Sequence, residues 1–219
     1  MNVKGAIFDM DGTLIDSLPV WKILWQKVGE KYLNDKSFYP SHEDDKAVRT
    51  STLEVGMELI HKRYNIANSG EELSNFTRDI FKWYYEEICP LKDGVIEFLE
   101  YLKSKGVKMC IASASSGGFV KLCMQKFNIE KYFIKIVSCN DIGKGKEFPD
   151  VFFKAQEVLG TNLSETFVIE DSLVALTTAK NAGFKTIGVY DENNYGYEEI
   201  INLADYIVKK GESFKKFIK

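Results

Sequence analysis

Histidine and cysteine are scarce in this 219-residue sequence. A hydrolase with a Ser-His-Asp triad would have to use His42 or His61, and neither lies near a Gly-x-Ser-x-Gly turn, so this class is disfavoured. The four cysteines form no Cys-x-x-Cys pair and three of them have apolar surroundings, which predicts reduced core cysteines and argues against a zinc site. They are Cys89, Cys110, Cys123 and Cys139.

Long apolar runs and a strong excess of either charge are also missing. Lysine or glutamate interrupts every run well before the roughly 18 to 20 residues of a membrane-spanning helix. A formal net charge of -3 gives no electrostatic case for binding nucleic acid or an anionic membrane. The first residues, MNVKGAIFDMDG, run straight into acids and show no signal-peptide cleavage site. We therefore expect a cytoplasmic protein with no nucleic-acid or membrane partner; its oligomeric state cannot be read from the sequence.

Short runs of β-branched residues alternate with helical patterns along most of the chain, which predicts parallel strands joined by crossover helices. In GVIEFLEYLKSKG, for example, Val95, Phe98, Leu99 and Leu102 fall on one helical face before Gly106 ends the pattern. We expect a three-layer, Rossmann-like α/β core with a mostly parallel sheet. The predicted strands are residues 4–10, 107–113, 134–139, 166–171, 185–190 and 204–208.

The interval from about Asp16 to Ile88 is different, because it contains no convincing strand. Its apolar residues recur at helical spacing, with a polar break at residues 33–46. A helical insertion between the first strand and the rest of an α/β sheet predicts a separate cap. We expect a core of residues 1–15 and 91–219 and a helical cap of residues 16–90. Most aromatic residues of the cap follow the helical spacing, which favours cap core over a substrate pocket.

Ligands of open parallel sheets bind beyond the carboxyl ends of the strands, so the residues that follow each predicted strand are candidates for function. Asp9 and Asp11 follow the first strand, and the segment SASSGG follows the second. The loop after the third strand supplies Lys144 and Lys146, and the fourth strand ends in Glu170, Asp171 and Ser172. Acids, hydroxyls, glycines and a lysine are therefore expected at one edge of the sheet.

A hard cation explains why the acids stand together. Two unit charges about 4 Å apart interact by roughly 4 kcal/mol at an effective dielectric near 20, so Asp9, Asp11 and Asp171 would repel one another without a counterion. Magnesium prefers oxygen ligands and commonly binds one or two carboxylates together with a substrate phosphate. The hydroxyl, backbone N–H and lysine groups suit that phosphate. The pattern indicates a Mg²⁺ cofactor and a substrate that carries a phosphoryl group.

The two-residue spacing of Asp9 and Asp11 lets both face the substrate, because alternate residues of an extended segment point the same way. One carboxylate can attack phosphorus and form an aspartyl phosphate, while the other protonates the leaving oxygen and later takes a proton from water. A carboxylate that touches the metal stays ionised. This favours Asp9 for the attack and leaves Asp11 to carry the proton.

Four segments, DMDGTLIDS, IASASSG, KGKEFPD and VIEDSLVALTTAKNAG, occur in the order and approximate spacing of the four motifs of the haloacid dehalogenase superfamily. The sequence resembles this family over essentially its whole length. The helical insertion resembles the small cap of the subfamily that includes phosphoglycolate phosphatase and β-phosphoglucomutase. The resemblance implies Asp9 as nucleophile and Asp11 as general acid/base. It also implies the phosphate-binding residues Ser113, Ala114 and Lys146, and the metal ligands Asp9, Asp11 (through its main-chain carbonyl) and Asp171, with Glu170 in a supporting place.

The β-phosphoglucomutases resemble this chain in length and in the segment IASAS. Where those enzymes have a histidine in the first cap helix, this chain has Trp21, and where they have a cap lysine it has a residue near Ile80. Arg49 matches the cap arginine that grips a second phosphate in the mutases; the alternative for Arg49 is an exposed arginine at a helix start. Water as acceptor gives a phosphatase and a bound sugar phosphate gives a mutase. The two replaced residues favour hydrolysis.

The expected function is therefore Mg-dependent hydrolysis of a sugar phosphate or phosphoglycolate type of metabolite through an aspartyl phosphate. A β-phosphoglucomutase-type activity is the alternative. A dehalogenase is disfavoured, because dehalogenases lack the acid/base that Asp11 supplies. A receiver-like signalling module would be a single compact domain without a cap, and a non-catalytic binding protein would not need Asp11.

Overall fold

The computed structural model describes residues 3–49, 51–115 and 117–218, which divide into two compact units. The larger unit comprises Met1–Leu18 and Cys89–Lys219, and the smaller unit comprises Pro19–Ile88. The boundaries expected from the sequence, after residue 15 and before residue 91, lie three and two residues away from these.

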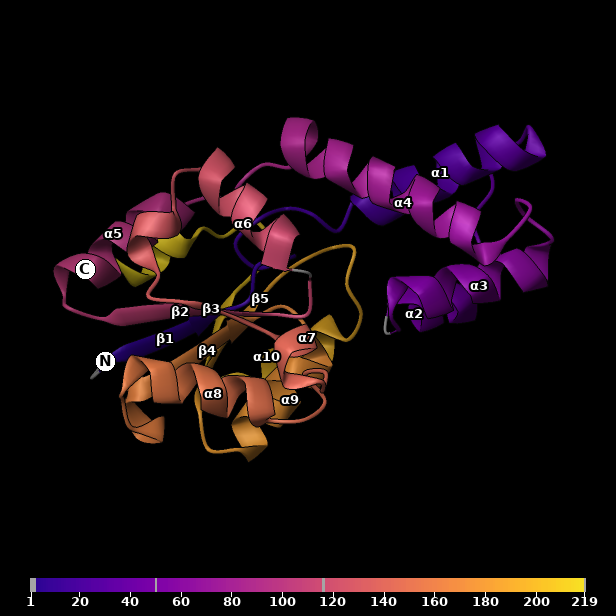
Figure 1. Ribbon diagram of the computed structural model, residues 1–219. Helices are drawn as coiled ribbons and strands as arrows, with labels where there is room; N and C mark the ends of the chain where they lie inside the picture. Colours follow the sequence, from indigo (N-terminus) through magenta and orange to yellow (C-terminus); the bar gives the residue numbers. More distant parts are fainter. Residues whose placement is uncertain (1–2, 50, 116, 219) are drawn as a thin grey trace. The chain divides into compact units, whose positions relative to one another are not determined.

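The larger unit contains one parallel sheet with the strand order β3-β2-β1-β4-β5-β6 (Figure 1). Each strand lies within a segment that the sequence predicts as strand. The central strand β1 pairs with β2 on one side and β4 on the other, and all its residues are buried. The order therefore reverses at β1, and sheets of this kind bind ligands beyond the strand ends at that point. The strands are β1 (Gly5–Phe8), β2 (Lys108–Ser113), β3 (Ile136–Ser138), β4 (Thr166–Glu170), β5 (Lys185–Val189) and β6 (Tyr206–Val208).

Helices cover both faces of the sheet and complete the expected three-layer core (Figure 1). Helix α8 packs on one face, where its Phe152 joins Ile7 of β1 in the main apolar cluster. Helix α5 lies on the other face, where its Phe98 contacts Phe8 with ring centroids 6.2 Å apart. Neighbouring residues of β1 thus serve opposite faces, as the pleat of a strand requires. The helices of this unit are α5 (Val95–Ser104), α6 (Gly117–Lys126), α7 (Cys139–Ile142), α8 (Asp150–Leu159), α9 (Leu173–Asn181) and α10 (Tyr197–Leu203), with 3₁₀ turns η2 (Glu130–Tyr132), η3 (Leu163–Glu165) and η4 (Phe214–Phe217).

The smaller unit consists of helices and the loops between them, and its described residues, 19–49 and 51–88, contain no strand. Side-chain caps start two of its helices: Thr52 accepts a hydrogen bond from the Val55 N–H, and Ser69 accepts one from the Glu72 N–H. Trp25 is fully buried, as the helical spacing predicts. The elements are α1 (Val20–Leu33), α2 (His42–Arg49), α3 (Leu53–Tyr64), α4 (Gly70–Trp83) and a π-helical turn η1 (Tyr84–Ile88).

Helix α2 begins inside the segment that the sequence suggests as a polar break. Its buried residues are Asp44, Asp45 and Val48, so its inner face is largely charged. Asp45 accepts a hydrogen bond from Trp25 Nε1 at 2.6 Å, and Asp44 accepts one from the Tyr64 hydroxyl at 2.6 Å. A helix held by buried carboxylates has no apolar stripe, which is why periodicity does not reveal it.

The two segments that connect the units pair with each other inside the larger unit. The backbone N–H of Asp16 donates to Pro90 O at 2.9 Å, and that of Lys92 donates to Leu14 O at 2.9 Å. The segment after β1 is thereby fixed to the segment that leads into α5.

All four cysteines are buried and free of disulfides, as predicted. Burial raises the pKa of each thiol, so these groups stay protonated at neutral pH. Across the described residues, we find no helix that combines the length and the apolar character needed to span a membrane.

Candidate active site

Asp9 lies directly beyond the carboxyl end of the central strand. Its backbone N–H donates to Ile169 O of β4 at 3.0 Å, and its side chain is only 8% exposed. The Lys146 ammonium contacts both the Asp9 carboxylate and the Glu170 carboxylate. Residues from the first, third and fourth strand ends therefore meet, as the sequence predicts for this edge of the sheet.

The turn after Asp9 brings Gly12 and Thr13 against Asp171. Gly12 has φ +75°, and a Cβ atom at this position would overlap the Asp171 carboxylate, so both the backbone and the space require glycine. The buried Thr13 hydroxyl donates to Asp171 Oδ1 at 2.9 Å. The segment DMDGT thus supplies Asp9, Asp11 and the turn that fits around Asp171, the residue directly after β4.

The Asp11 carboxylate lies beside the segment that follows β2. Ser115 Oγ donates to Asp11 Oδ2 at 2.7 Å, and the Ser115 N–H donates to Ser113 Oγ at 3.0 Å. Ser113 is buried at the end of β2, whereas Ala114 is exposed. The phosphate-binding roles of Ser113 and Ala114 stay predictions.

Glu170 uses both of its carboxylate oxygens within the protein. Oε1 contacts Lys146, and Oε2 accepts hydrogen bonds from the Asp171 and Ser172 N–H groups, both at 3.0 Å. Ser172 then caps α9 by accepting a hydrogen bond from the Ala175 N–H. Glu170 therefore supports the loop after β4 and positions Lys146.

The carboxylates of Asp9, Glu170 and Asp171 have ligand oxygens within 4.8 Å of one another, and all three residues are buried. Burial raises the pKa of Asp9 well above its usual range despite the nearby Lys146, and burial together with the charge of Glu170 raises the pKa of Asp171 to about 8. Burial alone would lower the pKa of Lys146, but the charges of Asp9 and Glu170 outweigh it and raise that pKa. Lys146 thus stays charged between the acids.

This donor set fits a hard divalent cation. Three buried carboxylates face one ammonium, so the ionised cluster carries excess negative charge, and every candidate donor is an oxygen atom. Asp9 and Asp171 would hold the cation, and their ionised forms are the ones that burial disfavours in its absence. The Asp11 carboxylate is not part of this cluster and instead accepts a hydrogen bond from Ser115. This agrees with the resemblance, which assigns Asp11 to the metal only through its main-chain carbonyl.

Arg49 is the last residue of α2 and is held within the smaller unit. Its Nη2 lies 2.9 Å from Asp45 Oδ2 and donates to the Tyr39 hydroxyl at 3.1 Å, and its guanidinium lies 5.3 Å from the Trp21 ring centroid. Its side chain is 15% exposed, so the alternative of an exposed arginine at a helix start is wrong. Contact between Arg49 and a substrate phosphate stays a prediction.

Three polar residues of the site were given no role from the sequence. Thr13 and Ser115 lie in strand-end segments, so their position was a usable signal, but their partners were not evident. Asn194 lies in the loop after β5, and its Nδ2 donates to Asp171 Oδ2 at 2.6 Å. The rule that ligands bind beyond strand ends also points to this loop.

The metal-free protein is expected to lose stability as the pH rises from 5 to 8. A carboxyl with a raised pKa stabilises the fold fully below its unfolded value, near 3.8, and this contribution is lost towards the folded value, about 8 for Asp171. Mg²⁺ binds the ionised carboxylates, so it should raise the unfolding temperature more at pH 8 than at pH 5. A shift of roughly 5–10 °C is expected at pH 8 with Mg²⁺ at about a hundred times its Kd.

Thermal unfolding with and without Mg²⁺ at the two pH values measures this effect. Asp171→Asn should flatten the pH dependence of the metal-free protein and remove most of the Mg²⁺ shift. Asp141→Asn changes an exposed aspartate in the same way and should behave like the wild type. An equal Mg²⁺ shift at both pH values would contradict the assignment of Asp9 and Asp171 as cation ligands.

Comparison with known proteins agrees with this geometry. The family model described as haloacid dehalogenase-like hydrolase matches residues 6–189. The chain is 28% identical over 212 residues to a phosphorylated carbohydrates phosphatase from Thermotoga maritima, covering 96% of each chain. It is 24% identical to a phosphoglycolate phosphatase from Shigella boydii, covering 93% of this chain and 86% of the relative.

A similar solved structure is that of a provisionally named beta-phosphoglucomutase from Thermotoga maritima, with a TM-score of 0.78, 26% identity and 94% of each chain covered. The family match spans the strand ends that carry Asp9, Asp11, Lys146 and Asp171. The chain therefore belongs to the haloacid dehalogenase-like hydrolase family.

Proposed function

We propose that this protein is a magnesium-dependent phosphatase that hydrolyses a small phosphorylated metabolite through an aspartyl phosphate on Asp9. The observation that supports it most is the buried contact of Lys146 with Asp9 and Glu170, next to Asp171. This constellation supplies a nucleophile, a cation for the substrate phosphate and oxygen ligands for a metal ion. The relatives named as phosphatases support the same reaction class.

In the first step, a carboxylate oxygen of Asp9 attacks the phosphorus atom. A bond forms between this oxygen and phosphorus while the bond from phosphorus to the leaving oxygen breaks. Asp11 donates its proton to that leaving oxygen, so that an alcohol departs instead of an alkoxide. Ser115 holds the Asp11 carboxylate through the 2.7 Å hydrogen bond to Oδ2.

In the second step, Asp11 acts in its ionised form and takes a proton from water. The water oxygen attacks phosphorus, and the bond to Asp9 breaks to release inorganic phosphate and the free carboxylate. The proton that Asp11 acquires restores the acid for the next turnover. For the two displacements at phosphorus the protein thus supplies one nucleophile, Asp9, and one proton carrier, Asp11, and water is the second nucleophile.

Lys146 and Ser113 are proposed to bind the phosphoryl oxygens. Mg²⁺, when bound by Asp9, Asp171 and the Asp11 carbonyl, supplies positive charge that offsets the repulsion between the substrate phosphate and the carboxylates. The buried ammonium of Lys146 adds a fixed positive charge on the same side of Asp9. Glu170 keeps that ammonium in place.

A screen of phosphorylated metabolites tests the proposal. Phosphate release should depend on Mg²⁺, stop when the metal is chelated, and be fastest with a sugar phosphate or phosphoglycolate among compounds that include nucleotides and p-nitrophenyl phosphate. Comparison of monophosphates with bisphosphates of the same sugar also tests Arg49. To bind the second phosphate of a bisphosphate, Arg49 would have to give up its contact with Asp45. No phosphate release from any of these compounds with Mg²⁺ would contradict the proposal.

The mutase alternative is supported by the provisional name of the Thermotoga maritima structure. Two positions of the smaller unit argue against it, because they carry Trp21 and Ile80 in place of the histidine and lysine expected for a mutase. Trp21 packs edge-to-face on Phe81, with ring centroids 5.0 Å apart, and Ile80 is buried, so neither side chain offers an acid/base or a cation. Formation of glucose 6-phosphate from β-glucose 1-phosphate and its bisphosphate activator distinguishes the two. We expect free phosphate to exceed glucose 6-phosphate; the reverse ratio would establish the mutase.

A further inference from the structure

Asn194, in the loop after β5 (residues 190–196), contacts Asp171. Asn194 Nδ2 donates to Asp171 Oδ2 at 2.6 Å and to the Asp171 carbonyl oxygen at 3.1 Å. Asn194 Oδ1 accepts a hydrogen bond from the Tyr195 N–H at 2.8 Å. Both ends of the amide are thus matched to a partner, and only one orientation of the amide satisfies all three contacts.

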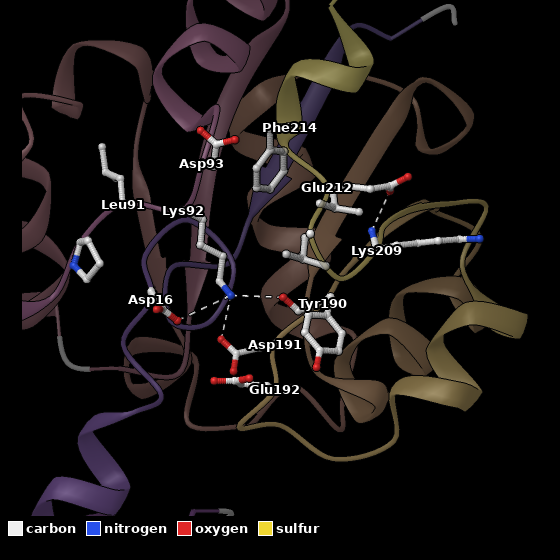
Figure 2. Close-up of a pocket in the computed structure, with 14 residues that line it drawn as sticks. Asp16, Leu91, Lys92, Asp93, Tyr190, Asp191, Glu192, Lys209, Glu212 and Phe214 are labelled. Carbon is white, nitrogen blue, oxygen red and sulfur yellow. Dashed lines mark hydrogen bonds and ion pairs between the residues drawn. The ribbon is translucent and has the colours of Figure 1, made fainter.

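A second group anchors the base of this loop. Asp191 is buried; its Oδ1 accepts from the Asn193 N–H at 2.8 Å, and its Oδ2 lies 2.8 Å from Lys92 Nζ. Lys92 Nζ also donates to the Tyr190 carbonyl oxygen at 3.2 Å (Figure 2). Lys92 belongs to the connecting segment that leads into α5, so an ion pair ties that segment to the loop carrying Asn194.

The Asp171 carboxylate is therefore held at both oxygens. Thr13 donates to Oδ1 at 2.9 Å and Asn194 donates to Oδ2 at 2.6 Å. Each carboxylate oxygen has a second lone pair, which stays available for a cation once the first is used by a donor. Two donors on opposite oxygens also fix the plane of the carboxylate. Asn194 does this as a neutral group and adds no further negative charge to the acidic cluster.

We propose that Asn194 is a positioning residue that orients Asp171 for binding a divalent cation, and that the Lys92–Asp191 pair holds the loop so that this contact forms. This inference rests on the proposed function, which makes Asp171 a metal ligand. Outer groups that orient a metal ligand typically change metal affinity by about 10-fold to 100-fold when they are removed. Asn194 and Lys92 lie outside the four motif segments, so neither was singled out from the sequence.

Calorimetric titration of the metal-free protein with Mg²⁺ tests the role of Asn194. Asn194→Ala should raise the Kd for Mg²⁺ by about 10-fold to 100-fold. The Mg²⁺ concentration that gives half-maximal phosphate release should rise by the same factor, while kcat at saturating Mg²⁺ changes by less than about threefold, because Asn194 touches no reacting atom. Asn202→Ala removes an exposed amide from α10, where its Nδ2 donates to the Glu198 carbonyl oxygen, and should leave the Kd unchanged.

The Lys92–Asp191 pair is tested by a double-mutant cycle. Lys92→Met should raise the Kd for Mg²⁺ in the wild-type background and have little further effect in the Asn194→Ala background, and Lys92→Arg should restore most of the affinity. An equal effect of Lys92→Met in both backgrounds would overturn the role of the pair.

If the wild type binds Mg²⁺ and Asn194→Ala binds it equally well, the inference is wrong and the proposed function stands. If the wild type binds no Mg²⁺, both are wrong. The two failures are thereby distinguished by the wild-type titration alone.

Discussion

Asp9→Asn is expected to slow phosphate release at least about 10³-fold while the protein still folds. The amide oxygen of asparagine is too weak a nucleophile to attack phosphorus, so no aspartyl phosphate forms. Asparagine has nearly the size of aspartate and its carbonyl oxygen can still accept a hydrogen bond from Lys146, which should preserve the local structure. Phosphate release at saturating Mg²⁺ from the best substrate of the screen measures the loss.

Asp141→Asn provides the matched control, because it replaces an exposed aspartate of α7 by the same amide. It should retain the wild-type rate. Unfolding curves of both variants establish that the compared proteins are folded. A rate for Asp9→Asn within about threefold of the wild type would show that Asp9 is not the nucleophile.

Asp11→Asn is expected to lower kcat/KM for an alkyl phosphate by about 10²-fold to 10⁴-fold. The reason is that an alkoxide leaves poorly unless it receives a proton, and asparagine has none to give. With p-nitrophenyl phosphate the loss in kcat/KM should be much smaller, because p-nitrophenolate is stable without protonation. The ratio of the two losses therefore measures the proton transfer itself.

The parameter kcat/KM is chosen because it reports the step up to formation of the aspartyl phosphate and excludes its hydrolysis. Ser115 can still donate to the carbonyl oxygen of the introduced asparagine, so the hydrogen bond to this side chain is preserved. An equal loss with both substrates would contradict the role of Asp11 as the acid for the leaving group. It would indicate a contribution to binding or structure instead.

The core and its acids could be predicted because both follow from short-range patterns. Each strand is a short apolar run, and parallel strands end at the same edge of a sheet, so the residues after several strands must meet. Lys146 and Asp9 illustrate this: they are 137 positions apart in the sequence and in contact in the structure. Their positions after two parallel strands predict one edge of the sheet, and the resemblance singles out Lys146 from Lys144.

The contacts that orient these groups could not be predicted in the same way. Ser115 reaches Asp11, and Asn194 reaches Asp171, through the particular shape of two loops, and no periodic pattern encodes that shape. Helix α2 was missed for a related reason: its buried face carries Asp44 and Asp45, whose partners are polar groups on other elements. The ion pair between Arg49 and Asp45 could not be predicted either, because it depends on both residues lying in helix α2.

The central claim is that the phosphoryl group passes through Asp9 before it reaches water. The steric course at phosphorus tests this most directly, with a chiral phosphorothioate substrate whose two non-bridging oxygens are different isotopes. Hydrolysis in water that carries the third oxygen isotope gives a chiral thiophosphate, whose configuration is analysed. Each in-line displacement inverts phosphorus. Two displacements, first by Asp9 and then by water, predict overall retention; inversion would mean that water attacks the substrate directly and would contradict the account.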